Sequence, residues 1–449
     1  MKVKIILRIS LSIILYSLIL ISSVPSVSLS AENQTIYIRS DGRIEPADAP
    51  IKSLNNVTYT LLADISGSII VERDNIIING SNHVIRGTGK GIGIDISERK
   101  NVTIINVEIQ AFSDAIWLYK SANNSIKKNR ILNNNFGIWV GWYSQGNIIC
   151  WNNISNNKNG IWIEKSINNH VYQNNFTNNE WYSVKLAYSQ NNIIEQNNLI
   201  KNEWGISMES CKNNIIINNN IKENQIGVFI KEAFNNSICG NNFLENGKQV
   251  LVNYTESIAG SSNIWNHDYP LGGNYWSDYN GFDKYFGPYQ NESGSDGIGD
   301  TSYIIDGSNV DNYPLMGIIS TFNVSGYQLN IISNFKIQKV EYFKHNSSIV
   351  IFASNTANNN TLFYRLEIPS GLLTPPYSVT INGTIINTAF IYQDPEVTVI
   401  YLSHDPTTNN LRVIIVPESS ILAIATLMFF STIVLLGKVR KISRLVEYN

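Results

Sequence analysis

A repeat of about 22 residues limits the fold of this chain more than any other feature of its sequence. A small residue followed by an apolar alternation recurs, as in Gly137-Ile138-Trp139-Val140. The first apolar positions of these stretches are Ile116, Ile138, Ile161, Val184, Ile206, Val228 and Val250. A second motif, Asn-Asn-x-Ile-x-x-Asn-x-apolar, has the same period, and its Ile or Val falls at Ile126, Ile149, Val171, Ile194, Ile216 and Ile238. Alternation with a period of two is typical of strands with one buried face, and units this short must stack to enclose a core.

The stacked repeats predict an all-β chain built around a right-handed parallel β-helix. Each strand is expected to pair with its equivalent one coil later, about 4.8 Å away, and right-handed crossovers are the default for parallel strands. Equivalent apolar residues then form inward rows. Asn residues form a polar row at one turn, where their amides bond to the neighbouring coils. That row consists of Asn124, Asn147, Asn169, Asn192, Asn214 and Asn236.

Changes of pattern divide the rest of the chain. Lys2, Lys4 and Arg8 precede an apolar run, which predicts a secretory signal peptide over residues 1–31, with an uncleaved anchor as the alternative. Residues 32–64 are expected to cap the β-helix, 65–270 to form it and 271–318 to close it. Residues 319–416 show short alternating runs separated by turn residues, which predicts a small β-sandwich acting as a spacer.

The C-terminal residues predict a membrane anchor. The uncharged stretch 419–437 is long enough to cross a bilayer as a helix, and the basic tail 438–449 predicts a cytoplasmic end. The body is therefore expected outside the cell, in a single-pass protein of the cell membrane. Its Asn-x-Ser/Thr sequons predict a glycoprotein. A net charge of -2 argues against nucleic acid as a partner, and three Cys are too few for a disulfide framework.

Aromatic residues occupy one outward row of the predicted coils. Trp117, Trp139 and Trp162 hold successive equivalent positions, and Tyr182 and Trp204 follow nearby. Flat apolar rings at the spacing of the coils are suited to stacking against sugar rings. These five residues are therefore the candidate carbohydrate-binding site. The alternative is that they pack under a loop or under the distal domain.

Glu164 and Glu209 are the candidate catalytic residues. They occupy one row two coils apart, about 9.6 Å by strand spacing. This is close to the upper end, ~9.5 Å, of the carboxylate separation in inverting glycosidases. Two acids on a long row are also common without any catalytic role.

The segment from Glu292 to Asp300 has the spacing of a calcium-binding loop, in which oxygen ligands alternate and Gly makes the turn. Asp296 and Asp300 are the candidate calcium ligands. The alternative is a turn of Asp and Gly residues that caps the helix.

From about Val57 to Met316 the chain resembles the NosD-like family of right-handed parallel β-helix proteins, also grouped as carbohydrate-binding and sugar-hydrolase (CASH) domains. The resemblance is carried by the Asn-Asn-x-Ile repeats and by Gly273-Asn274-Tyr275-Trp276-Ser277-Asp278-Tyr279, Gly297-Ile298-Gly299-Asp300-Thr301, Asp306 and Asp311-Asn312-Tyr313-Pro314-Leu315-Met316. It implies an envelope protein of the archaeal surface-protein type.

The expected function is a cell-surface, membrane-anchored protein that binds glycans or envelope proteins without catalysis. The alternative is a hydrolase or lyase that acts on polysaccharide. The family name also suggests copper, but the His residues are scattered, at His83, His170, His267, His345 and His404. Copper is therefore not expected, and calcium is the only cofactor predicted.

Overall fold

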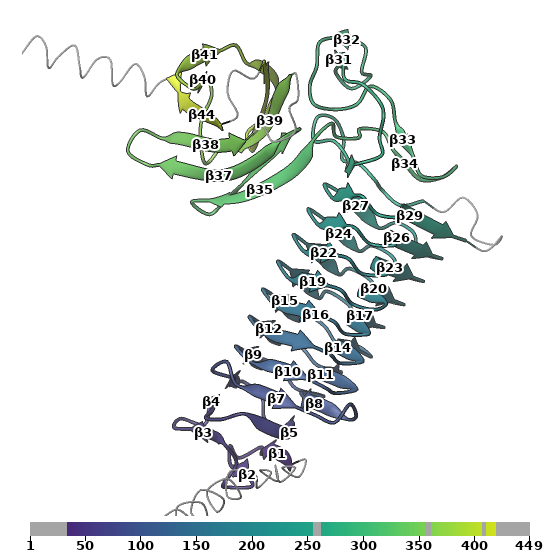
Figure 1. Ribbon diagram of the computed structural model, residues 1–449, viewed down its shortest axis with the longest axis vertical. Helices are drawn as coiled ribbons and strands as arrows, with labels where there is room; N and C mark the ends of the chain where they lie inside the picture. Colours follow the sequence, from purple (N-terminus) through teal and green to yellow (C-terminus); the bar gives the residue numbers. More distant parts are fainter. Residues whose placement is uncertain (1–33, 255–261, 355–360, 406–409, 419–449) are drawn as a thin grey trace, which may run out of the picture.

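The computed structural model describes residues 34–254, 262–354, 361–405 and 410–418. Figure 1 shows a long stack of coils that starts at the N-terminal end of this region, with further sheets beside its far end. The predicted signal peptide (1–31), transmembrane helix (419–437) and basic tail (438–449) lie outside the described residues. Within the described ranges, no helix is long and apolar enough to cross a membrane.

Three strand faces form the coils. The first face contains β5 (Ile65–Val71), β8 (Ile92–Asp95), β11 (Asp114–Tyr119), β14 (Phe136–Gly141), β17 (Asn159–Glu164), β20 (Tyr182–Ala187), β23 (Trp204–Glu209), β26 (Ile226–Lys231) and β29 (Lys248–Asn253). Each strand pairs in parallel with its equivalent in the next coil, and Ile138 lies between Ile116 and Ile161 as the sequence predicts. The predicted parallel coils and their register are confirmed.

The second face is a ten-stranded sheet. It contains β3 (Ile51–Ser53), β4 (Thr58–Leu61), β6 (Ile77–Asn79), β9 (Thr103–Ile105), β12 (Ser125–Lys127), β15 (Ile148–Cys150), β18 (His170–Tyr172), β21 (Ile193–Glu195), β24 (Ile215–Ile217) and β27 (Ser237–Cys239). The third face contains β7 (Val84–Arg86), β10 (Glu108–Gln110), β13 (Arg130–Leu132), β16 (Asn153–Ser155), β19 (Asn175–Thr177), β22 (Asn198–Ile200), β25 (Asn220–Lys222), β28 (Asn242–Leu244) and β30 (Tyr275–Trp276).

Parallel stacking starts before residue 65. Strand β1 (Gln34–Ile38), which also pairs with β2 (Ile44–Glu45), lies parallel to β5 with Gln34 opposite Gly67. The segment expected to cap the helix is thus itself stacked on the first coil.

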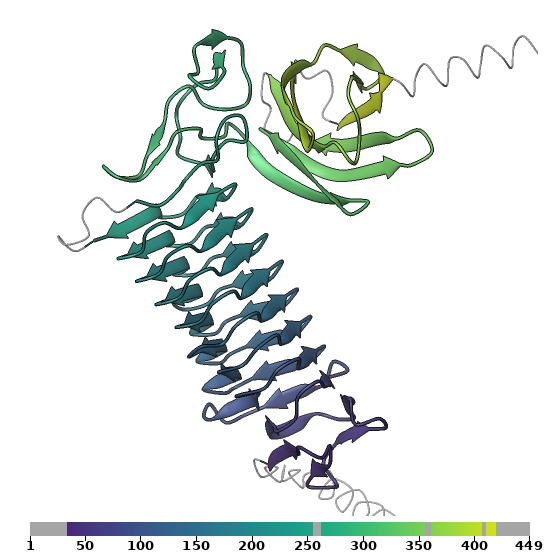
Figure 2. The same ribbon diagram turned by 180° about the vertical axis from the view of Figure 1, so that it is seen from behind.

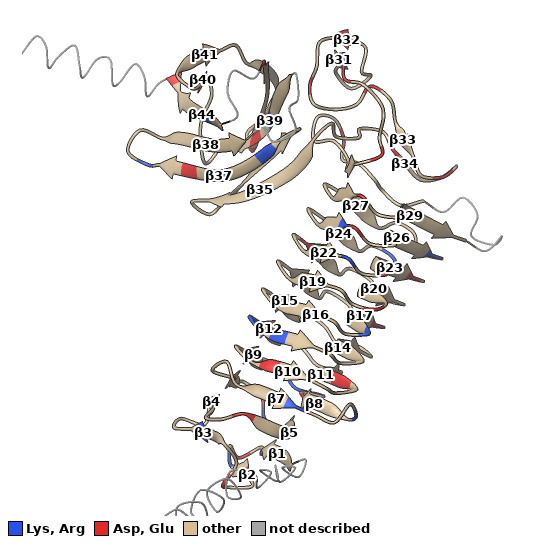
Figure 3. Cartoon of the chain, viewed as in Figure 1, with Lys and Arg blue, Asp and Glu red and all other residues tan. Residues whose placement is uncertain are grey.

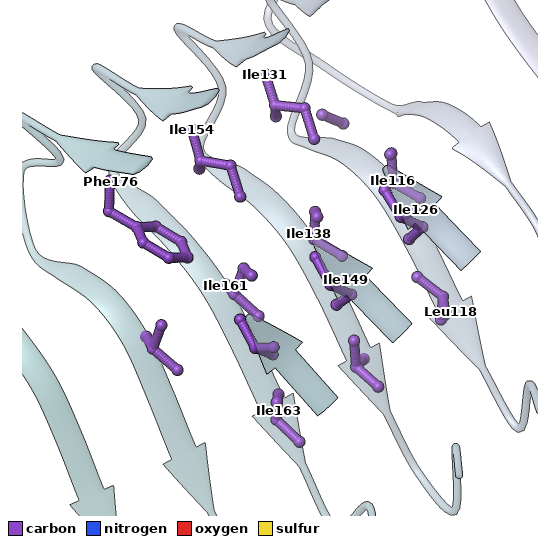
Figure 4. Packing of buried hydrophobic residues seen from close by; sticks show 14 of the residues in the cluster. Ile116, Leu118, Ile126, Ile131, Ile138, Ile149, Ile154, Ile161, Ile163 and Phe176 are labelled. Carbon is purple, nitrogen blue, oxygen red and sulfur yellow. The ribbon is translucent and has the colours of Figure 1, made fainter. Parts of the chain in front are cut away.

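An apolar column fills the interior of the stack. Figure 4 shows Ile116, Ile126 and Ile131, one from each face, with their equivalents in the next coils. These side chains are completely buried. Burying an aliphatic side chain stabilises a fold by roughly 1.5–3 kcal/mol, so these rows are the main source of stability of the coils.

Asn side chains form three rows along the turns, of which the sequence predicted the one that includes Asn124. The second row is Asn129, Asn152, Asn174, Asn197, Asn219 and Asn241, and the third is Asn134, Asn157, Asn179, Asn202, Asn224 and Asn246. Each side-chain oxygen accepts hydrogen bonds from the equivalent Asn one coil earlier. Asn197 Oδ1, for example, accepts from the backbone N of Asn174 at 2.9 Å and from its Nδ2 at 3.1 Å. The hydrogen bonds from one Asn to the next all run in the same direction along a row, so the last Asn of a row needs a further acceptor.

The closing segment supplies these acceptors. Asn274 continues the second row, and its backbone N–H donates to Asp311 Oδ2 at 2.8 Å. Trp276 Nε1 donates to the same oxygen at 2.9 Å. The backbone N–H of Asn263, which continues the first row, donates to Asn309 Oδ1 at 3.0 Å. Residues 271–318 therefore end the first and second Asn rows. Their short strand pairs include β31 (Tyr285–Phe286), β32 (Glu292–Ser293), β33 (Tyr303–Ile304) and β34 (Val310–Asp311).

Two five-stranded antiparallel sheets follow. In spatial order, one contains β35 (Ile318–Val324), β36 (Tyr327–Ser333), β39 (Leu362–Pro369), β43 (Val397–His404) and β42 (Ala389–Gln393). The other contains β37 (Lys336–Phe343), β38 (Ser348–Ser354), β44 (Asn410–Pro417), β40 (Tyr377–Ile381) and β41 (Thr384–Ile386). Both sheets contribute to one buried cluster that includes Ile331, Ile351, Leu366 and Val413, which is the packing of a β-sandwich.

Polar contacts join these sheets to the end of the stack, where Figures 1 and 2 place them side by side. Arg365 of β39 is completely buried and donates to the backbone oxygens of Asp296, at 2.6 Å, and of Pro270. The side chain of Asn242 exchanges two hydrogen bonds with the backbone of Ile319, at 2.9 and 2.8 Å. The C-terminal sheets are therefore bound both to the closing segment, at Asp296, and directly to the coils, at Asn242.

Candidate functional site

Two outward rows of the first face carry aromatic side chains. One row runs through Trp117, Trp139, Trp162, Lys185, Ser207 and Phe229, and the neighbouring row includes Phe136, Tyr182 and Trp204. All seven rings are partly exposed. We call these seven aromatic residues the aromatic stripe. It contains all five residues predicted from the sequence, together with Phe136 and Phe229, which the prediction missed although they hold equivalent positions in the repeat.

Neighbouring rings of the aromatic stripe are in contact along its length. The ring centroids of Trp117 and Trp139 lie 4.4 Å apart, and those of Trp139 and Trp162 lie 5.9 Å apart. The two rows meet at Trp162 and Tyr182, whose centroids are 6.3 Å apart. Tyr182 then contacts Trp204 at 4.7 Å. The parallel register alone brings these rings together from five successive coils.

The two central indoles turn their polar edge toward the protein. The Nε1 atoms of Trp139 and Trp162 are buried and have no hydrogen-bond partner in the described residues. Gly141 makes room for the first of them, because a Cβ at this position would lie 3.0 Å from Trp139 Nε1. What these rings present to solvent is therefore hydrocarbon, which forms an apolar contact surface.

Charged groups border the aromatic stripe. Lys185 Nζ lies 4.5 Å from the ring centroid of Trp162 and 3.0 Å from Glu209 Oε2. Lys231 Nζ lies 2.9 Å from Glu209 Oε1. Burial acts to raise the pKa of Glu209, but the hydrogen bonds from Lys231 and Lys185 outweigh it and lower the pKa below its ordinary value. Glu209 is thus held as a carboxylate between two ammonium groups.

Glu164 and Glu209 lie on one row, as predicted, separated by Ala187. An inverting glycosidase needs one of its two carboxyl groups protonated, with a raised pKa, to act as the general acid. The lowered pKa of Glu209 does not favour that role. Catalysis by this pair stays a prediction.

A cavity of about 170 Å³ opens beside Tyr182 and Trp204 of the aromatic stripe. Trp181, Tyr182, Glu203 and Trp204 line it. Lys158 Nζ lies 4.1 Å from the ring centroid of Trp181. Three rings beside a carboxylate and an ammonium group combine an apolar wall with hydrogen-bonding groups of both kinds.

The C-terminal sheets do not cover the aromatic stripe. Figure 1 shows these sheets on the side of β24 and β27, away from β14, β17 and β20. In the described residues, the side-chain hydrogen bonds between these sheets and the coils lie at the second and third faces, as at Gln196 and Asn242. Figure 3 shows that the coils are mostly uncharged. Burial of the rings under the distal domain, the alternative considered above, is therefore not what the described residues show.

Residues 53–281 match the family model described as "Periplasmic copper-binding protein (NosD)". The chain belongs to the NosD family. No curated protein sequence matches it. Solved structures with a similar fold include a mutant of the periplasmic alginate epimerase AlgG, at 17% identity and a TM-score of 0.38 over 52% of this chain and 74% of that one. An alginate lyase from Paenibacillus sp. str. FPU-7 is similar at 16% identity and a TM-score of 0.37, over 49% of this chain and 86% of that one.

The donor side chains of this NosD-family chain do not fit a copper site in the part that the structure describes. Copper is bound by clusters of Cys, His or Met side chains. Cys150 and Cys239 lie in one row four coils apart, about 19 Å by strand spacing. His170 bonds instead to Glu195, with Nε2 3.0 Å from Oε2. The described ranges contain no group of three or more His, Cys, Asp or Glu that could hold a metal ion.

Asp296 and Asp300 each bind backbone amides of the closing segment. Asp296 is completely buried, and its Oδ1 accepts from the backbone N of Ile298 at 2.9 Å. The Asp300 carboxylate accepts from the backbone N atoms of Lys284 at 3.0 Å and Tyr285 at 3.2 Å. These bonds organise the turns of the closing segment. Calcium binding there stays a prediction.

The closing segment also contains a carboxylate with a large pKa shift, Asp283. Its two oxygens accept from the backbone N atoms of Asp296 at 3.0 Å and Gly297 at 2.8 Å, yet burial raises its pKa to about 7. The ordinary value is about 3.9, so between about pH 4 and 7 the folded chain binds a proton that the unfolded chain does not. This contribution to stability is present at low pH and is lost as the pH rises through 7.

Asp283→Asn should therefore make the free energy of unfolding depend less on pH. The slope of the unfolding free energy against pH should differ between the two proteins by at most about 1.4 kcal/mol per pH unit. This difference is expected only between about pH 4 and 7. Urea unfolding of both proteins at a series of pH values measures it. Parallel curves for the two proteins across this range would contradict the prediction.

Proposed function

We propose that this NosD-family protein is a membrane-anchored surface protein whose coils bind carbohydrate chains of the envelope on the aromatic stripe, without catalysis. The body lies outside the cell, and the stretch 419–437 holds it in the membrane. The observation that carries the proposal is the continuous, partly exposed stripe of seven touching rings, which the described C-terminal sheets leave uncovered.

The physical argument begins from exposed apolar surface. Soluble proteins rarely expose contiguous apolar patches, and those bordered by polar groups mark binding sites. Sugar rings have apolar C–H faces and hydroxyl rims, so they suit hydrocarbon edges bordered by charged groups. The Lys185–Glu209–Lys231 cluster and the cavity at Glu203 offer such groups. The copper in the family description has no matching donor cluster in the described residues.

The test is a glycan array with the full-length protein beside the double variant Trp139→Ala/Trp162→Ala. We expect the unchanged protein to bind one or more glycans on the array. The double variant should bind the same glycans about tenfold or more weakly, because both substitutions remove apolar contact surface from the middle of the stripe. The matched control is Trp151→Ala, which removes an exposed indole, 47% accessible, that lies outside the stripe.

Each other outcome counts against the proposal. Equal loss of binding in the Trp151→Ala control would mean that the effect is not specific to the stripe. Release of product from a bound glycan, abolished by Glu164→Gln, would replace binding without catalysis by an enzyme. Failure of the folded protein to bind any glycan would remove carbohydrate as the ligand.

A further inference from the structure

A second concave site lies where the coils, the closing segment and the first C-terminal sheet meet. It is a cavity of about 340 Å³, within the usual size range of small-molecule sites. Ile217 of β24 and Leu315 of the closing segment line one part, and Ile332 of β36 and Val397 of β43 line another. Its walls are therefore largely apolar and come from three separate parts of the chain.

Hydrogen bonds between these parts hold the cavity open. Ile319, which lines the cavity, is bound to Asn242 of the coils by the two hydrogen bonds described above. Gln328, which also lines it, accepts a hydrogen bond from Gln196 Nε2 at 3.1 Å. The walls are thus fixed on both sides of the junction, and the cavity is preformed.

The charged side chains of the cavity are acidic. Glu367 and Glu396 line it, and no Lys or Arg is among the described residues that do. His267 also lines it, but burial lowers the pKa of its imidazole, so it is neutral at neutral pH. The cavity therefore favours a cation.

Glu367 has one cationic neighbour, Arg365, at the outer limit of ion-pair distance. The Glu367 side chain is only 12% exposed, and Asn330 Nδ2 donates to its Oε2 at 2.9 Å. The nearest cation is Arg365, but its Nε atom is 3.9 Å from Glu367 Oε1 and its terminal nitrogens bind backbone oxygens. Burial raises the pKa of Glu367, which reflects incomplete compensation of its charge.

We infer that this cavity binds a small organic amine, whose ammonium group pairs with Glu367 and whose apolar body contacts Ile217, Leu315 and Val397. The site is independent of the aromatic stripe, which lies on another face of the coils. A neutral ligand of the same shape can fill the apolar part of the cavity, but it has no ammonium group to pair with Glu367.

Calorimetric titration of the full-length protein with phenethylamine and with phenethyl alcohol at neutral pH tests this inference. We expect the amine to bind about tenfold or more tightly than the alcohol. In Glu367→Gln, affinity for the amine should fall about tenfold while affinity for the alcohol stays the same. Glu341→Gln on β37, outside the cavity, is the matched control and should leave both affinities unchanged.

A second variant keeps the test decisive if Glu367→Gln does not fold. Val397→Phe fills the cavity and should abolish binding of both compounds. Equal affinity for amine and alcohol, undiminished amine binding in either folded variant, or no binding of either compound would overturn the inference. Glycan binding by the aromatic stripe is not affected by any of these outcomes.

Discussion

Ile161→Asp is expected to lower the free energy of unfolding by several kcal/mol, because it places a carboxylate with no partner inside the apolar column. Ile161 is completely buried in β17, between Ile138 and Val184 of the adjacent coils. Urea unfolding followed by circular dichroism measures the loss. A midpoint equal to that of the parent would show that Ile161 does not face the interior.

Ile148→Asp is the matched control for this substitution. Ile148 lies on β15 with its side chain 40% exposed, so the same chemical change leaves the new carboxylate in contact with water. We expect a loss of about 1 kcal/mol or less, which reflects the poor strand preference of Asp. Equal losses in both variants would mean that the cost arises from the strand backbone and not from burial.

Asn197→Leu is expected to cost roughly 2–5 kcal/mol, because it leaves two or more buried polar groups without partners. Asn197 Oδ1 accepts from the backbone N and Nδ2 of Asn174, and Asn197 Nδ2 donates to Val171 O at 2.9 Å and Asn219 Oδ1 at 3.0 Å. Leu has a similar volume but can make none of these bonds. The measurement is again urea unfolding.

The adjacent residue provides the control. Asn198 is exposed on β22, and Asn198→Leu should change the free energy of unfolding by about 0.5 kcal/mol or less. If Asn197→Leu is as mild as Asn198→Leu, the Asn rows contribute little to holding the coils together, and the apolar column alone sets their stability.

The rows of the coils could be predicted from the sequence because the repeat length fixes which residues become neighbours. Ile116, Ile138 and Ile161 fall at equal steps, and a parallel ladder pairs residues at equal steps. The same logic placed Trp117, Trp139 and Trp162 side by side. The order of residues along each row follows from the repeat length alone and does not depend on how the side chains pack.

The second and third Asn rows were missed although part of their signal was present. The third Asn of the Asn-Asn-x-Ile-x-x-Asn motif is Asn129 and its equivalents, and Asn134 follows five positions later. Asn favours turns as well as ladders, so its repetition alone does not show a side chain turned inward. The burial of Asn129 and Asn134 decides between the two.

The ends of the coils and the details of the site depend on contacts without any period. Asp311 ends an Asn row, and Arg365 crosses from a C-terminal sheet to Asp296 and Pro270. The pairing of Glu209 with both Lys185 and Lys231 likewise depends on side-chain conformations of three different coils. No spacing in the sequence distinguishes such a paired Glu from one free to act as an acid.

The one-way direction of the Asn rows makes the coil a modular unit of length. Along each row, the Asn side-chain oxygen of an interior coil accepts from the Asn of the coil before it, and two of the rows end at the different acceptors Asn309 and Asp311. A whole coil can therefore be gained or lost without any change at either end. Each such change would lengthen or shorten the stack by about 4.8 Å, the spacing between neighbouring strands.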